Sequence, residues 1–137
     1  MRRMPEEKIV AGLRGSASVV VSDEHTAPSI GSGKVRVLAT PVMINLIEAA
    51  ALKAIEHLLR PGYQSLGTHL DVHHIAATPV GMKARAIAVV TKVDGRTVTF
   101  KVEAHDEKDL IGHGTHERVV VNVAKFDARV QQKLGVK

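Results

Sequence analysis

The sequence predicts an α+β domain in which an antiparallel sheet wraps around one long buried helix. Residues 41–59 are apolar on almost every side at helical spacing, which is typical of a buried helix. Four strand-like segments follow, at about 65–77, 82–93, 96–106 and 110–124. Short turns join these strands, so consecutive strands must be antiparallel. The buried side of such a sheet needs an apolar cover, and only the helix is apolar enough to supply it.

The chain before the helix predicts a short strand over residues 16–22 and then a loop. The loop, residues 23–34, contains Pro28, Gly31 and Gly33 and has little to bury. A second short strand, over residues 35–39, then leads into the helix.

Thr40 and Pro41 mark the start of the helix, because Thr is a preferred N-cap and Pro is favoured at the first helical position. The helix is expected to stop before Arg60-Pro61-Gly62. A membrane-spanning helix is excluded, because polar and charged residues interrupt a segment already at the short end for spanning. These residues are Asn45, Glu48, Lys53 and Glu56.

The later strands differ in regularity. Residues 96–104 alternate cleanly, with Val98, Phe100, Val102 and Ala104 on one face. The segment 110–124 does not alternate, since Gly112, Gly114 and a polar run through Arg118 break the pattern, and we expect a bulge or a site there. Residues 125–133 have helical spacing and are expected to pack on the outside.

Composition limits the function. A chain of 137 residues fits one domain, residues 1–137 with a core at about 16–133. It has no cysteine, which excludes disulfides and thiolate zinc sites, and its charged start lacks the apolar run of a secretory signal, so we expect a cytoplasmic protein. The net charge of +5 favours a polyanionic partner. With two Phe, one Tyr and no Trp there is no stacking platform for bases, so a phosphorylated small molecule is favoured over nucleic acid.

His74 is the most informative residue. In the strand at 65–77, alternation assigns His69, Asp71 and His73 to one face and Leu70, Val72, His74 and Ala76 to the other. Of the three histidines, only His74 therefore shares the apolar side. A desolvated imidazole titrates close to neutral pH, which suits general acid-base chemistry. The alternative is a core histidine with its hydrogen bonds satisfied.

Several motifs follow one another along the chain. They are Ala39-Thr40-Pro41 with Glu48, Ser65-Leu66-Gly67-Thr68, His74 with Ala76-Ala77-Thr78-Pro79 and Gly81, Ala104-His105-Asp106, and Ile111-Gly112 with Gly114-Thr115-His116-Glu117-Arg118. In order and with matching spacing over roughly residues 16–133, they closely resemble the fluoroacetyl-coenzyme A thioesterase family. The resemblance implies a homodimeric hot-dog fold thioesterase that hydrolyses an acyl-CoA without any cofactor beyond its substrate. It implies Thr40, Glu48 and His74 as active-site residues, and it places Gly67 and Arg118 near the bound substrate.

Thioester hydrolysis needs a nucleophile or an activated water, a base, an acid for the leaving thiolate and a donor for the oxyanion. Thr40, Glu48 and His74 are candidates for the first three, and backbone N–H groups around Gly67 or at the helix N-terminus for the fourth. The alternatives are a capping role for Thr40 and a solvated stripe for Glu48. A carboxylate in an apolar stretch favours a histidine partner. Eight residues nevertheless separate Thr40 from Glu48 by about 12 Å along a regular helix. Either the helix starts later, or the site collects groups from two subunits.

The acyl specificity is expected to differ from that of the fluoroacetyl-CoA enzyme, whose lid over the acyl group contains phenylalanines. The corresponding segment here, residues 25–38, has no aromatic residue, so we expect another short or medium acyl chain. Two other functions remain open. A metal enzyme would use His113 with His116, or His69 with Asp71 and His73, although strand alternation points the first pair to opposite faces. The other is a non-enzymatic module that binds acyl-CoA as a sensor.

Overall fold

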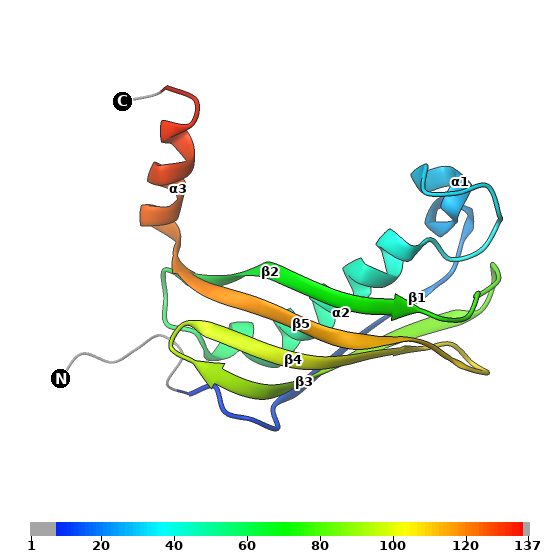
Figure 1. Cartoon of the computed structure of the whole chain (residues 1–137), viewed down its shortest axis with the longest axis horizontal. Coiled ribbons are helices and arrows are strands. Elements are labelled where there is room, and N and C mark those ends of the chain that lie inside the picture. The colour runs from blue at the N-terminus through cyan, green and yellow to red at the C-terminus, as the bar shows by residue number, and fades with distance from the viewer. Residues whose placement is uncertain (1–7, 136–137) are drawn as a thin grey trace.

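In the computed structural model, which describes residues 8–135, a curved antiparallel sheet packs against one central helix (Figure 1). The strands are β1 (Arg14–Val20), β2 (Tyr63–His74), β3 (Lys83–Asp94), β4 (Thr97–His105) and β5 (Leu110–Asn122), in the spatial order β1-β3-β4-β5-β2. The predicted α+β architecture is confirmed. Strands β1 and β2 form the two edges of this sheet. Most of the charged start of the chain, on which the cytoplasmic prediction rests, lies outside the described residues.

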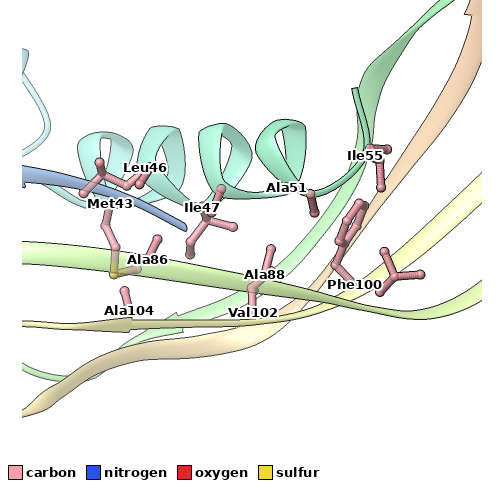
Figure 2. Packing of buried hydrophobic residues seen from close by; sticks show 14 of the residues in the cluster. Met43, Leu46, Ile47, Ala51, Ile55, Ala86, Ala88, Phe100, Val102 and Ala104 are labelled. Atoms are coloured by element: carbon pink, nitrogen blue, oxygen red, sulfur yellow. The ribbon is translucent and has the colours of Figure 1, made fainter. Parts of the chain in front are cut away.

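The central helix α2 (Thr40–Ile55) continues into a single 3-10 turn, η2 (Glu56–Leu58), close to the predicted bounds. Figure 2 shows Met43, Ile47, Ala51 and Ile55 directed from this helix toward the sheet. The facing row of β3 consists of alanines that are fully buried, namely Ala84, Ala86 and Ala88. Such small side chains let the helix lie close to the sheet, and this fixes the position of its N-terminus relative to the ends of the strands.

The start of α2 differs from the prediction in one consequential respect. Ala39, in extended conformation, is the N-cap, so Thr40 is the first helical residue and Pro41 the second. No side chain caps this helix, and the prediction of Thr40 as its cap is therefore wrong. The hydroxyl of Thr40 is free for a different partner.

The segment before the helix also differs. No strand forms over residues 35–39; Leu38 makes only an isolated bridge to Thr26. The predicted loop contains two short helices, η1 (Asp23–His25) and α1 (Ala27–Ile30). Two backbone hydrogen bonds, Ala27 N to Val37 O and Ala39 N to His25 O, tie this segment back onto itself. Residues 37–39 thus pair with a nearby loop and not with a strand. For this reason the strand-like pattern of residues 35–39 forms no ladder of β-sheet hydrogen bonds.

Two bulges shape the neighbouring strands β5 and β2. The expected irregularity of β5 is confirmed: its register with β4 jumps from Gly112 opposite Ala104 to Leu110 opposite His105. On β2, the register with β5 shifts at Thr68. Beyond this second bulge the alternation changes phase, so Gly67 and His74 both face α2 although they are an odd number of residues apart.

The C-terminal helix α3 (Val123–Gln132) forms as predicted, but it does not pack along the outside of the sheet. None of its residues is buried, and Figure 1 shows it projecting beyond the end of the sheet. Among the described residues, no helix is long and apolar enough to cross a membrane.

Candidate active site

Thr40 and His74 form the centre of the candidate site. The last residue of β2 meets the first turn of α2, and Thr40 Oγ1 lies 2.7 Å from His74 Nδ1. The hydroxyl is available because Thr40 does not cap its helix. Thr40 is exposed and His74 half-buried, so a substrate can reach this pair from solvent.

The surroundings of His74 favour a neutral ring. Burial lowers the pKa of His74 below its ordinary value, and the Ala76 backbone opposes this shift only in part. Its Nε2 atom is buried and has no hydrogen-bond partner of good geometry within the described chain. If Nε2 carries the ring proton, Nδ1 accepts the hydrogen bond from Thr40. A neutral imidazole at this distance from a hydroxyl has the geometry of a general base.

A cavity of about 370 Å³ opens beside the pair. Its lining is mostly small and apolar and contains no phenylalanine, tyrosine or tryptophan: Ala27, Ser32, Gly33, Lys34, Val35, Val37, Leu38, Thr40, His74, Ile75, Ala76 and Ala77. A backbone hydrogen bond from Leu38 to Thr78 (2.9 Å) joins its two walls, and the buried Thr78 hydroxyl donates to Asp106 (2.9 Å). The cavity therefore has fixed walls on the side of the helix N-terminus.

Glu48 lies apart from this pair. Its Oε2 atom is 3.5 Å from Nη1 of Arg118, which is only 5% exposed. Within the described chain, no hydrogen bond or ion pair joins Glu48 to His74, so the expected pairing of these two residues is not made inside one chain. The helix does begin at Thr40, which excludes a later start as the solution to the distance between Thr40 and Glu48.

Gly67 and Arg118 gather around Glu48 rather than around Thr40. A Cβ on Gly67 would lie 2.5 Å from Glu48 Oε2 and 3.4 Å from Arg118 Nη1. Arg118 also donates to Ser65 and contacts His116. The structure thus forms two groups from the five predicted site residues: Thr40 with His74, and Glu48 with Gly67 and Arg118.

His116 and Ser65 belong to the second group and were not predicted from the sequence. The run from Thr115 to Arg118 contained a signal, because alternation puts His116 on the same buried face as Arg118. The sequence interpretation instead treated His116 as one half of a metal pair. His113 is exposed and stacks on His73 with ring centroids 5.3 Å apart, whereas His116 is buried on the opposite face. Over residues 8–135, no group of three His, Cys, Asp or Glu could hold a metal ion.

Comparison with known proteins supports the resemblance seen in the sequence. Residues 21–124 match the family model of the fluoroacetyl-CoA-specific thioesterases. The chain belongs to this family. The fluoroacetyl-CoA thioesterase of Streptantibioticus cattleyicolor is 46% identical over 97 residues, which are 71% of this chain and 70% of that protein. The family predicted from the sequence motifs is confirmed, and so is the enzyme class, a thioester hydrolase.

Solved structures show the same fold. A fluoroacetyl-CoA thioesterase superposes with a TM-score of 0.86 at 38% identity, covering 91% of this chain and 97% of its own. A thioesterase superfamily member from Thermus thermophilus covers 100% of both chains, with a TM-score of 0.83 and 32% identity. A hot-dog-like protein from Thermanaerovibrio acidaminovorans, at 24% identity, matches in fold alone with a TM-score of 0.86 over 96% of this chain and 98% of its own. The hot-dog fold is confirmed.

Proposed function

We propose that this enzyme hydrolyses a short acyl-CoA thioester, with Thr40 and His74 at the reacting centre. The observation that carries the proposal is the 2.7 Å contact between the Thr40 hydroxyl and His74 Nδ1 at the mouth of a small apolar cavity. A threonine hydroxyl is a weak nucleophile by itself and needs an adjacent base. The neutral imidazole, whose pKa burial lowers, supplies that base.

Two routes use this pair. In the first, His74 takes the proton of Thr40, the hydroxyl oxygen attacks the thioester carbonyl, and the C–S bond breaks to leave a threonine ester. His74 returns the proton to the coenzyme A thiolate, and water hydrolyses the ester. In the second, Thr40 and His74 hold a water that attacks the carbonyl directly. In both routes the positive end of the α2 dipole, where Thr40 is the first helical residue, stabilises the oxyanion.

The acyl group we propose is a short one. The relative from Streptantibioticus cattleyicolor is a fluoroacetyl-CoA thioesterase, and one related solved structure is a complex with acetyl-CoA. The cavity beside Thr40 is lined by Ala27, Val37 and Ala76 among others and has no phenylalanine, tyrosine or tryptophan in its lining. With no phenylalanine lid over the acyl group, we expect similar turnover of fluoroacetyl-CoA, acetyl-CoA and slightly longer acyl chains.

We further propose a homodimer joined edge to edge through its sheets. The edge strand β2 and the residue after it expose Leu66, Leu70 and Ile75, which are 37%, 41% and 54% accessible. An open apolar edge is a site for pairing with another strand. A dimer would also complete the active site. Glu48 of the partner subunit would lie beside His74, where Glu48 of the same chain does not lie.

Complementation tests the shared site. His74→Ala and Glu48→Gln are each expected to be nearly inactive. Co-expressed in equal amounts, half of the dimers are mixed, and each mixed dimer has one site with both native residues. Activity should then recover to about a quarter of the wild-type value. No recovery in a mixture shown to contain mixed dimers would contradict the shared site, and a monomer at micromolar concentration in sedimentation would contradict the dimer.

The basic character of the chain should serve the coenzyme A phosphates, with Lys34 at the cavity as one candidate contact. Free coenzyme A is then expected to inhibit competitively, and more weakly as salt rises. Inhibition that ignores ionic strength would show that the positive charge has another role.

A panel of acyl-CoA thioesters tests the proposed function itself, with release of the free thiol as the readout. The wild-type protein should hydrolyse short acyl-CoA, and His74→Ala should lower kcat by about 10²–10⁴-fold. His73→Ala is the matched control, because His73 precedes His74 in the same strand but lies exposed on the other face. Binding of acyl-CoA without hydrolysis by the wild-type protein would instead favour a sensor.

A further inference from the structure

His116 is a fully buried histidine that the proposed reaction does not use. It lies on β5 with 0% exposure, and its ring stacks on Phe100 with centroids 6.0 Å apart. Its Nδ1 atom is 2.8 Å from the carbonyl oxygen of His69, and its Nε2 atom is 3.1 Å from Arg118 Nη1.

These two partners decide where the ring proton is. A carbonyl oxygen only accepts hydrogen bonds, so Nδ1 of His116 must carry the hydrogen and donate it to His69. A guanidinium only donates, so Nε2 must accept from Arg118. The neutral Nδ1–H tautomer satisfies both contacts. A protonated ring would place an N–H on Nε2 directly against the N–H of Arg118 Nη1, and no hydrogen bond could form between them.

The charges that face this ring are Arg118, Glu48 and Glu117. Burial is the main influence and lowers the pKa of His116; Arg118 acts in the same direction, whereas the His69 carbonyl, Glu48 and Glu117 oppose it. The net shift keeps the ring neutral at physiological pH, in agreement with the tautomer that its partners require.

Arg118 is held by Ser65 in addition to His116. Its Nε donates to Ser65 Oγ (2.8 Å) and its Nη2 to the Ser65 carbonyl (3.2 Å). Ser65 in turn donates its backbone N–H and its hydroxyl to Glu56, both at 2.9 Å. Each guanidinium nitrogen thus has a partner, and the one that His116 accepts from, Nη1, is also the one that reaches Glu48.

We infer that His116 is a positioning residue: as a neutral acceptor it holds Arg118 Nη1 in the orientation that fixes the Glu48 carboxylate. The inference rests on the proposed function, in which Glu48 belongs to the active site. Glu48 is 38% exposed and stands on a helix, so without a fixed guanidinium its side chain can turn toward solvent. In this role the shape of the ring is not what matters. Any side chain that offers a hydrogen-bond acceptor at the position of Nε2 would hold Arg118 in the same way.

Two substitutions separate the acceptor from the ring. His116→Phe keeps an aromatic ring against Phe100 but removes both hydrogen bonds, whereas His116→Gln loses the ring but can offer an amide oxygen to Arg118. We expect His116→Phe to lower kcat at least tenfold with KM changed less than threefold, and His116→Gln to retain most of kcat. In a Glu48→Gln background the same His116→Phe change should cost less than twofold, because the carboxylate that it positions is gone.

Nuclear magnetic resonance of ¹⁵N-labelled histidine gives a readout independent of activity and of whether His116→Phe folds. In the wild-type protein, His116 should show the Nδ1–H tautomer at neutral pH, and its pKa should lie below that of an ordinary histidine, about 6.5. An Nε2–H or cationic ring would overturn the inference. So would a folded His116→Phe variant with wild-type kcat, an equal loss in both backgrounds, or a fully active Glu48→Gln variant. The proposed function fails differently, through a wild-type protein that hydrolyses no thioester or a His74→Ala variant that stays active.

Discussion

Gly67→Ala is a small change with a consequence that the structure quantifies. The added methyl carbon would lie 2.5 Å from Glu48 Oε2 and 3.1 Å from His116 Cε1. Ordinary contact begins at 3.4 Å, so the carboxylate must withdraw by about 0.9 Å, the difference between 3.4 and 2.5 Å. Because Glu48 is 38% exposed, its side chain has room to do so.

The expected result is an enzyme that folds but turns over slowly. A misplacement of about 1 Å in a catalytic constellation can cost up to about 10²-fold, so we expect kcat to fall between ten- and a hundredfold. The melting temperature should change by only a few degrees, since the closest contact is the end of a flexible side chain and the buried His116 ring must give by only about 0.3 Å, the difference between 3.4 and 3.1 Å.

Gly15→Ala is the contrasting variant. There the methyl meets the backbone of α2, including Ala54 N at 2.5 Å, and a packed helix backbone cannot withdraw. This variant should lose most of its stability. The assay is steady-state hydrolysis of acetyl-CoA beside a thermal melt of each variant. Wild-type kcat in a folded Gly67→Ala variant would refute the assignment of Glu48 to the site.

Three further results are expected. The acid limb of kcat/KM should lie below pH about 6.5, the ordinary pKa of histidine, because burial lowers the pKa of His74; a limb above that value would contradict His74 as the base. The free energy of unfolding should fall as the pH drops below about 6.5, since the unfolded chain then binds protons that folded His74 and His116 do not; denaturant titrations that show no pH dependence in this range would contradict it. Thr78→Val should lower the free energy of unfolding by about 1–3 kcal/mol in the same titrations and should raise KM. The reason is that Asp106 loses its hydrogen bond to the buried hydroxyl that anchors one cavity wall, and an unchanged unfolding midpoint would exclude this role.

Local patterns predicted the fold well. The all-round apolarity of residues 41–59 and the clean alternation of residues 96–104 both arise from burial against a neighbour, so they are visible in the sequence. The strand over residues 35–39 was wrong because its apolar residues cover a cavity and a loop. The cap at Thr40 was wrong because the helix begins one residue earlier than expected, with Ala39 as its N-cap, and the Thr40 hydroxyl contacts His74, which is 34 residues away.

The arrangement within the site depends on contacts that no local pattern records. Glu48 meets Arg118 across 70 residues, and the bulge at Thr68 decides that Gly67 faces the same helix as His74. Alternation correctly placed His74 on the inner face, since it lies on the regular part of β2 beyond that bulge. The inner-face position of His74 was thus predictable. Helical geometry predicted the separation of Thr40 from Glu48, whereas the lack of a contact between His74 and Glu48 within one chain was not predicted.

The most direct test of the Thr40–His74 centre compares kcat for acetyl-CoA hydrolysis in Thr40→Val and Thr40→Ser. Valine matches the shape of threonine without the hydroxyl, and no helix cap is lost because Ala39 is the N-cap. Serine keeps the hydroxyl within reach of His74 Nδ1. We predict that Thr40→Val loses at least about a hundredfold in kcat at a nearly unchanged melting temperature, while Thr40→Ser stays within about tenfold of the wild type. Wild-type kcat in Thr40→Val would contradict the account, because the hydroxyl would then take no part in the reaction.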